Sequence, residues 1–113
     1  MALQIENITA EADQTHVVIA DGIEVSLRLY FLSAVESWFM DCSFAGVSAA
    51  GIRLSAGAYH VLSYNLPFDF LVEITDRTGI DPFRADDFSS GRCLLWYVQR
   101  NEMLEIRGVE VPL

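Results

Sequence analysis

Apolar and polar residues alternate along much of this chain, and the alternation predicts strands rather than helices. The clearest segment is 23–31, in which every second residue is apolar, from Ile23 to Phe31. Successive side chains of a strand point to opposite faces, so this segment predicts a strand with one buried side. A second β-prone run, 16–20, precedes it, and Asp21-Gly22 between the two predicts a tight hairpin turn.

Further strands are expected at five more places along the chain: 38–44, 50–54, 70–75, 92–99 and 104–107. The stretch 59–62 fits either a strand or a short helical turn. Short strands that recur with turn signals at about ten-residue spacing predict a mainly β fold, an antiparallel barrel or sandwich of roughly seven strands. The length suits a single β-rich domain over 1–113.

The alternation stops between 76 and 91, a stretch rich in Asp, Gly and Ser that predicts one long irregular loop. A loop of this length in a small domain usually has a function or is partly mobile. We expect it to be an adaptable element that becomes ordered when a partner chain contacts it.

The loop contains an acidic cluster, Asp76, Asp81, Asp86 and Asp87. Carboxylates are ligands for Ca²⁺, but the Asp-x-Asp-x-Asp-Gly spacing is missing and arginines stand among the acids. Aspartates in turns commonly accept hydrogen bonds from backbone N–H groups, so we expect them to hold the loop together with arginine and to bind no metal. A metal-dependent hydrolase that uses the 76–87 cluster is the weakest alternative.

Composition narrows the range of partners. Hydrophobic residues make up 52% of the chain, which is too apolar for a disordered protein. The net charge is −9, and all seven basic residues are arginines. An acidic chain repels phosphate groups, so we expect no nucleic-acid partner and no anionic membrane surface. The N-terminus has no signal-peptide pattern, and no apolar run approaches the ~20 residues of a membrane span.

Candidate catalytic groups are few. His16 and His60 stand in no nucleophile motif, and we expect His16 at a strand surface and His60 packed or in an interface. A P-loop and Schiff-base chemistry both need a lysine, which is absent. Cys42 and Cys93 have no metal spacing; a disulfide is one alternative, and two buried thiols fit better because nothing marks the chain as secreted. We therefore expect no enzyme and no cofactor.

Aromatic residues favour protein binding instead. Tyr30 lies on the polar face of its strand, and one residue of each neighbouring pair 38–39 and 96–97 faces outward if the sheet has one wet side. Tyr and Trp are common anchors of protein interfaces. For Phe39 a second reading stays open, in which both faces of the sheet are covered.

An ordered set of short motifs covers most of the chain. Its members are an aromatic strand 38–42, Gly51-Ile52-Arg53-Leu54, Gly57, Leu62, Asp81-Pro82, Asp86-Asp87-Phe88, Gly91-Arg92 and Leu94-Leu95-Trp96-Tyr97. In this order the motifs, together with the N-terminal hairpin, resemble the small baseplate plug proteins of contractile-tailed phages, typified by a cyanophage baseplate plug.

The resemblance implies a structural virion protein, not an enzyme, that sits near the tail axis of the baseplate and contacts hub and tail-tube proteins. It also implies a homotrimer that assembles in the cytoplasm of the bacterial host. The residues then expected at protein interfaces are Tyr30, Trp38, Arg53, Asp81, Asp86, Asp87, Phe88 and Arg92. A stand-alone ligand-binding β-barrel is the alternative function.

Overall fold

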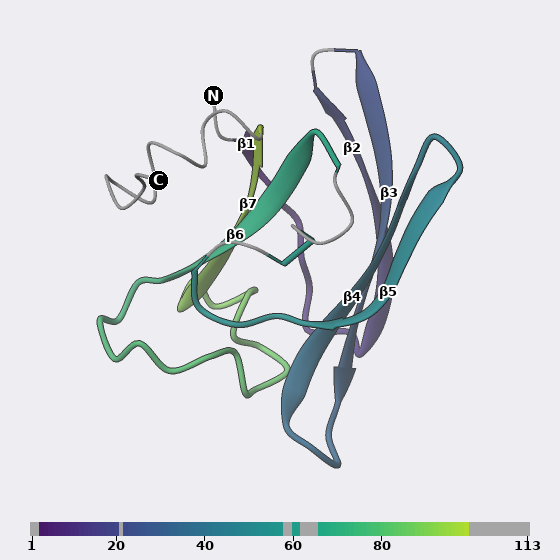
Figure 1. Cartoon of the computed structure of the whole chain (residues 1–113). Helices are drawn as coiled ribbons and strands as arrows, with labels where there is room; N and C mark the ends of the chain where they lie inside the picture. The colour runs from purple at the N-terminus through teal and green to yellow at the C-terminus, as the bar shows by residue number, and fades with distance from the viewer. Residues whose placement is uncertain (1–2, 21, 58–59, 62–65, 100–113) are drawn as a thin grey trace, which may run out of the picture.

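The computed structural model describes residues 3–20, 22–57, 60–61 and 66–99, and over these it consists of strands and loops (Figure 1). The strands, all antiparallel to their neighbours, are β1 (Leu3–Gln4), β2 (Asp13–Ala20), β3 (Ile23–Leu32), β4 (Ser37–Phe44), β5 (Val47–Arg53), β6 (Phe68–Ile74) and β7 (Cys93–Gln99). The predicted mainly β fold of seven strands is confirmed. The last expected strand, 104–107, and most of 59–62 lie outside the described residues.

The strands form two sheets, one in the order β2-β3-β4-β5 and the other in the order β1-β7-β6. Figure 1 shows the two sheets as two facing layers. Within the described residues no strand of one sheet pairs with a strand of the other, so the fold is an open sandwich and not a closed barrel.

Consecutive hairpins build the four-stranded sheet. Gly22 has a φ of 77° and stands between the paired residues Ala20 and Ile23, as the turn signal predicted. Ala45 and Gly46 both have positive φ, which makes a two-residue turn from β4 into β5. This tight turn is why β5 begins at Val47, three residues earlier than the sequence pattern predicted.

The three-stranded sheet brings distant parts of the chain together. β7 lies in its centre, paired with β6 on one side and with the two-residue strand β1 on the other. The sequence pattern did not predict β1, because two residues are too few to show an alternation. Its pairing places Leu3 opposite Tyr97 and fixes the start of the chain against the last described strand.

The core fills the space between the sheets. Val25, Leu27 and Leu29 point inward from β3, as the alternation predicted, and belong to the same core cluster as Phe70 and Tyr97 of the other sheet. Burying one such side chain contributes roughly 1.5–3 kcal/mol. Cys42 and Cys93 are both buried and free, as expected, and one stands in each sheet.

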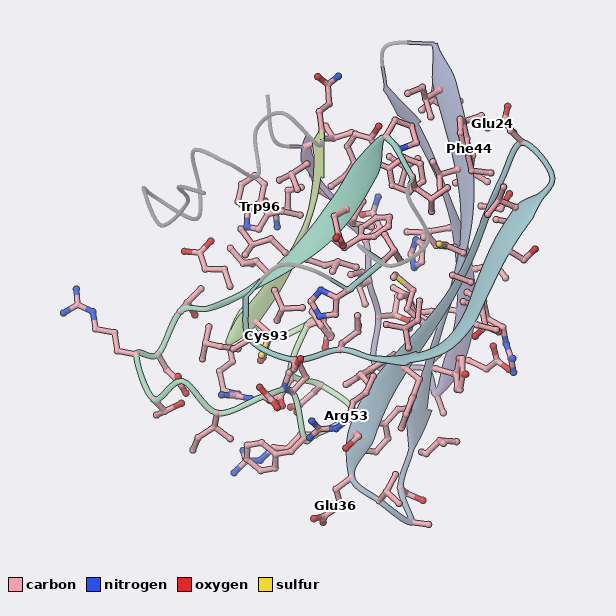
Figure 2. All side chains as sticks on the ribbon, in the orientation of Figure 1. Glu24, Glu36, Phe44, Arg53, Cys93 and Trp96 are labelled. Atoms are coloured by element: carbon pink, nitrogen blue, oxygen red, sulfur yellow. The ribbon has the colours of Figure 1, made fainter. Side chains whose placement is uncertain are left out.

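The structure also assigns the aromatic pairs. Trp38 and Tyr97 point into the core, and Phe39 and Trp96 point out. Phe39 stacks on Tyr30 with ring centroids 5.8 Å apart, so each covers part of the other. Trp96 lies on the side of the three-stranded sheet that faces away from the four-stranded sheet (Figure 2).

Candidate functional site

The long loop between β6 and β7 is the most elaborate irregular part of the molecule. It leaves the three-stranded sheet after β6 and crosses toward the end of β4 before it returns to β7 (Figure 1). Its base is closed where the Thr75 N–H donates to the Arg92 carbonyl at 2.8 Å. The loop contains most of the residues for which the sequence predicted an interface role.

Asp87 is the centre of the loop and is only 2% exposed. Its Oδ2 accepts the N–H groups of Phe83 at 2.7 Å and Arg84 at 2.9 Å. The Arg92 guanidinium donates in a bidentate manner, from Nε to Oδ1 at 2.9 Å and from Nη2 to Oδ2 at 3.0 Å. Burial raises the pKa of Asp87, but these bonds outweigh burial and hold the pKa below its usual value. Asp87 is therefore a buried, satisfied carboxylate.

Arg92 connects Asp87 to the rest of the loop. Its Nη2 also donates to the carbonyl of Asp81 at 3.0 Å, and its Nη1 lies 3.4 Å from Oδ2 of Asp76. The guanidinium stands over the Phe83 ring, 5.1 Å from the centroid. The bonds to Asp87 raise the pKa of Arg92, so its charge is permanent. One side chain thus holds three points of the loop together.

Asp81 joins the loop to the four-stranded sheet. Its Oδ2 lies 3.1 Å from Nη1 of Arg53, and its Oδ1 accepts the Ala56 N–H at 2.8 Å. Arg53 in turn donates from Nε to the hydroxyl of Ser37 on β4 at 3.2 Å. Figure 2 shows Arg53 between the end of β4 and the loop.

Trp38 anchors the loop in the core. Its indole N–H donates to the carbonyl of Arg84 at 2.9 Å, although 46 positions separate the two residues. The Phe88 ring meets the Trp38 ring edge-on, with centroids 5.5 Å apart. We call this set of contacts the loop brace: Trp38, Arg53, Asp81, Asp87, Phe88 and Arg92.

Six of the eight residues predicted at interfaces form the loop brace, and two do not. Tyr30 lies on the outer face of the four-stranded sheet, where its hydroxyl donates to Oδ1 of Asp41 at 3.1 Å. The Arg28 guanidinium stands 4.4 Å from the Tyr30 ring centroid. Asp86 lies exposed on the loop, and its carbonyl accepts the Ser90 N–H at 2.8 Å.

Three of the eight residues predicted at interfaces are buried within the chain. Trp38, Asp87 and Phe88 lie inside the chain, so they offer almost no surface to another protein. Their partners lie within the same chain: Asp87 accepts hydrogen bonds from loop residues, and the Trp38 and Phe88 rings pack against each other. The surface positions among the predicted residues are Tyr30, Arg53, Asp81, Asp86 and the partly exposed Arg92.

The aspartates of the loop are bonded within the chain. The expected ordering of the loop on contact with a partner stays a prediction. Asp76 is also bonded locally: its Oδ1 accepts both the N–H and the hydroxyl of Thr78, at 3.1 and 2.7 Å. Aspartates that accept backbone N–H groups and pair with arginine were predicted, and this is confirmed.

A second buried carboxylate escaped the sequence analysis. Asp69 on β6 is fully buried, and its Oδ1 accepts the N–H groups of Phe70 at 2.7 Å and Val61 at 2.9 Å. Burial raises the pKa of Asp69, against the opposing effect of these donors. The signal in the sequence was a single carboxylate inside the apolar run 68–72.

His60 lies beside Asp69 and connects Ser55, which follows β5, to Phe70 on β6. Its Nδ1 is 2.7 Å from the Phe70 carbonyl oxygen, and its Nε2 is 3.1 Å from both the N and the O of Ser55. The predicted packed position of His60 is confirmed. His16, also half-buried, lies 2.8 Å from Oε1 of Gln14.

The described residues offer little reactive chemistry. No three His, Cys, Asp or Glu side chains among them are grouped as a metal ion would require. Burial raises the pKa of both thiols, Cys42 and Cys93, to about 11, so they react slowly near neutral pH. The described part of the chain also has no helix that could cross a membrane. The contacts of the loop brace fix the path of the loop between β6 and β7.

No protein-family model matches this chain, and no curated protein sequence matches it either. The resemblance to phage baseplate plugs therefore stays a prediction that rests on the motifs themselves.

Proposed function

We propose that this chain is a structural subunit of a contractile phage tail baseplate, a plug subunit near the tail axis that contacts hub and tail-tube proteins. The proposal includes a homotrimer that assembles in the bacterial cytoplasm and remains in the virion. One observation supports it most: motifs that are scattered from Trp38 to Arg92, and that carry the resemblance, converge in the loop brace.

A loop held by several internal hydrogen bonds suits a permanently assembled part. The loop brace holds the base of the loop, and the tip carries the exposed side chains of Arg77 and Ile80. Arg77 and Gly79 both have positive φ, so the tip is a defined turn next to the Asp76–Thr78 bonds. Arginine and apolar side chains on a fixed surface are typical of protein interfaces.

Two measurements test the proposal. Quantitative peptide mass spectrometry on purified particles would count this chain against the main tail-tube protein, and a few copies per particle are expected. Absence from particles with complete tails would overturn the virion role. Native mass spectrometry of the isolated chain is expected to give a trimer, and a monomer at micromolar concentration would remove that part of the proposal.

A matched pair of variants tests the tip. Ile80→Asp places a charge on the exposed tip and is expected to reduce incorporation into particles without lowering the melting temperature. Val35→Asp makes the same change at an exposed apolar residue in the turn between β3 and β4, and serves as the control. Equal incorporation of the two variants would argue against the tip as a contact.

A further inference from the structure

The sheets have four edge strands, and only β2 is both long and uncovered among the described residues. β1 has two residues, and β5 has an irregular register opposite Met40–Cys42 with Gly51 at a φ of 69°. β6 is covered where Gly57 exchanges backbone hydrogen bonds with Val72 at 2.9 and 3.0 Å. β2 has eight residues in unbroken register with β3. Proteins usually protect such edges with charges, prolines, bulges or short length.

The backbone of β2 is ready to pair on its open side. The Ala12 carbonyl accepts the Phe31 N–H at 2.8 Å, which makes this the first hydrogen-bonded pair of the hairpin. Such pairs alternate along an antiparallel ladder, so the N–H and C=O groups of Thr15, Val17 and Ile19 point away from β3. No described residue forms a backbone hydrogen bond with them on that side.

Apolar side chains lie along this edge. Val17 is 59% exposed and Ile19 is 68% exposed. Beside them a crevice of about 370 Å³ separates β2 from the N-terminal segment, and Leu3 and Ile5 also line it. Exposed apolar side chains next to open backbone groups mark an interaction site.

The charge around β2 selects the kind of partner. Glu6 lines the crevice, and Glu24 stands exposed opposite Ile19, near the start of β3 (Figure 2). Among the described residues, the guanidinium on the outer face beside β2 is that of Arg28, which is bonded to Asp13 at 2.7 Å and to Asp41 at 3.4 Å. In this described part of the chain, four carboxylates thus stand against one guanidinium. A second copy of a chain with a net charge of −9 is repelled here, whereas a basic segment is attracted.

We propose that the β2 edge binds an extended strand of another protein, in which apolar residues alternate with lysine or arginine. The strand adds to the four-stranded sheet by backbone hydrogen bonds. Because its side chains alternate between two faces, its apolar residues enter the crevice beside Leu3 and Ile5, and its basic residues lie on the outer face, across Val17 and Ile19 toward Glu24. This inference does not depend on the baseplate role. If both hold, the strand belongs to a hub or tail-tube protein.

The test uses the full chain and a capped peptide of alternating Val and Lys with the same length as β2, eight residues. The matched probe is the same peptide with Glu in place of Lys. At low salt we expect the Lys peptide to bind more tightly by about tenfold or more, as measured by fluorescence anisotropy. Hydrogen exchange of the Thr15, Val17 and Ile19 amides is expected to slow by about tenfold with the Lys peptide bound.

Variants localise the binding. Val17→Lys places a positive charge on the edge and is expected to weaken binding of the Lys peptide by about tenfold. Val47→Lys makes the same change at an exposed residue of β5 and is expected to leave binding unchanged. Circular dichroism checks the fold of both, and if Val17→Lys does not fold, the exchange measurement on the natural chain decides.

Three outcomes would overturn the inference: equal binding of the two peptides, unchanged exchange at the three amides, or equal weakening by the two variants. Protection of the same amides that grows with protein concentration alone would assign the edge to a second copy instead. None of these results alters the copy number in particles, so the two proposals fail separately.

Discussion

Asp69 and Asp87 are the two carboxylates buried among the described residues, and their surroundings are opposite. Asp87 has a bidentate guanidinium and two N–H donors, and its pKa is lowered. Asp69 has two N–H donors on one oxygen, while its Oδ2 has no hydrogen-bond partner among the described residues, and its pKa is raised. Asp69 lies deeper in the protein than Asp87 and has no guanidinium beside it, so burial raises its pKa, whereas the bonds from Arg92 and the two N–H groups lower the pKa of Asp87.

The comparison separates two ways to use a buried carboxylate. At Asp87 the ionised form is part of the structure, because removing its charge would leave the largely buried Arg92 with only the longer, 3.4 Å pair to Asp76. At Asp69 the oxygen that accepts the two N–H groups stabilises the fold, whereas ionisation of the buried group is unfavourable. A substitution by asparagine, which keeps one oxygen and removes the ionisable group, should therefore lower stability strongly at Asp87 and change it little at Asp69.

The largest effect is expected from Asp87→Asn. The amide keeps one oxygen for backbone donors but removes the closer counter-ion of Arg92, whose side chain is only 15% exposed, and leaves Asp76 at 3.4 Å as its remaining partner. Breaking a buried ion pair by changing one partner costs about 3–5 kcal/mol. Urea unfolding followed by circular dichroism measures this loss of stability. Asp86→Asn, on the neighbouring exposed residue, is the control and should change stability by less than about 0.5 kcal/mol.

The pH dependence of stability sharpens the comparison. The folded-state pKa of Asp87 lies below the unfolded value of about 3.9, so its stabilisation is present above that pH and is lost as pH falls through the folded pKa. For Asp69 the folded pKa is raised, so its stabilisation is present at acid pH and is lost as pH rises through the folded pKa.

Unfolding curves at a series of pH values check both signs. The penalty of Asp87→Asn relative to the natural chain should shrink as the solution is acidified. Asp69→Asn should gain stability relative to the natural chain as pH rises. The same sign for both variants would break the contrast between the two sites.

A smaller effect is expected from Asp69→Asn at neutral pH. The amide oxygen can still accept the N–H groups of Phe70 and Val61, and the buried ionisable group is gone. We expect a change of less than about 1 kcal/mol in either direction, because the removal of a buried ionisable group and the burial of a new amide donor oppose each other. A loss as large as that of Asp87→Asn would mean that the ionised form of Asp69 is required.

The smallest effect is expected from Arg53→Ala, which removes the outer ion pair of the loop brace. The side chains of Arg53 and Asp81 are 52% and 31% exposed, so solvent screens the pair. Exposed pairs contribute about 0.2–1 kcal/mol, and Asp81 keeps its bond to the Ala56 N–H. Thermal unfolding of this variant next to Asp87→Asn compares an exposed and a buried anchor of the same loop.

The sequence predicted the strands of the four-stranded sheet well, because one wet face produces a clear alternation in residues such as Val25, Leu27 and Leu29. It did not predict which of Trp38 and Phe39 is buried. Both are aromatic, because Phe39 stacks on Tyr30 on the outer face, so apolar and polar residues do not alternate at this point. It missed β1, which exists through its pairing with β7 rather than through its own pattern.

The loop could be predicted in kind but not in detail. The composition of the loop predicts that aspartates pair with arginines. It does not predict that Asp87 pairs with Arg92, because this depends on a chain path in which the N–H groups of Phe83 and Arg84 also point toward the Asp87 carboxylate. The bond from Trp38 to the Arg84 carbonyl spans 46 positions and leaves no local mark in the sequence. Asp69 was missed because burial of a lone carboxylate is decided by the neighbours of β6.

The strand orders imply a sequence of events during synthesis. The four-stranded sheet uses neighbours in the chain and is complete once Arg53 has been made. The three-stranded sheet pairs Leu3 with Tyr97 and must wait for β7. Non-local pairing is slow, so the nascent chain carries one finished layer whose apolar face has no cover until β7 has been made. Docking of the second layer is therefore expected to be the slow step of folding.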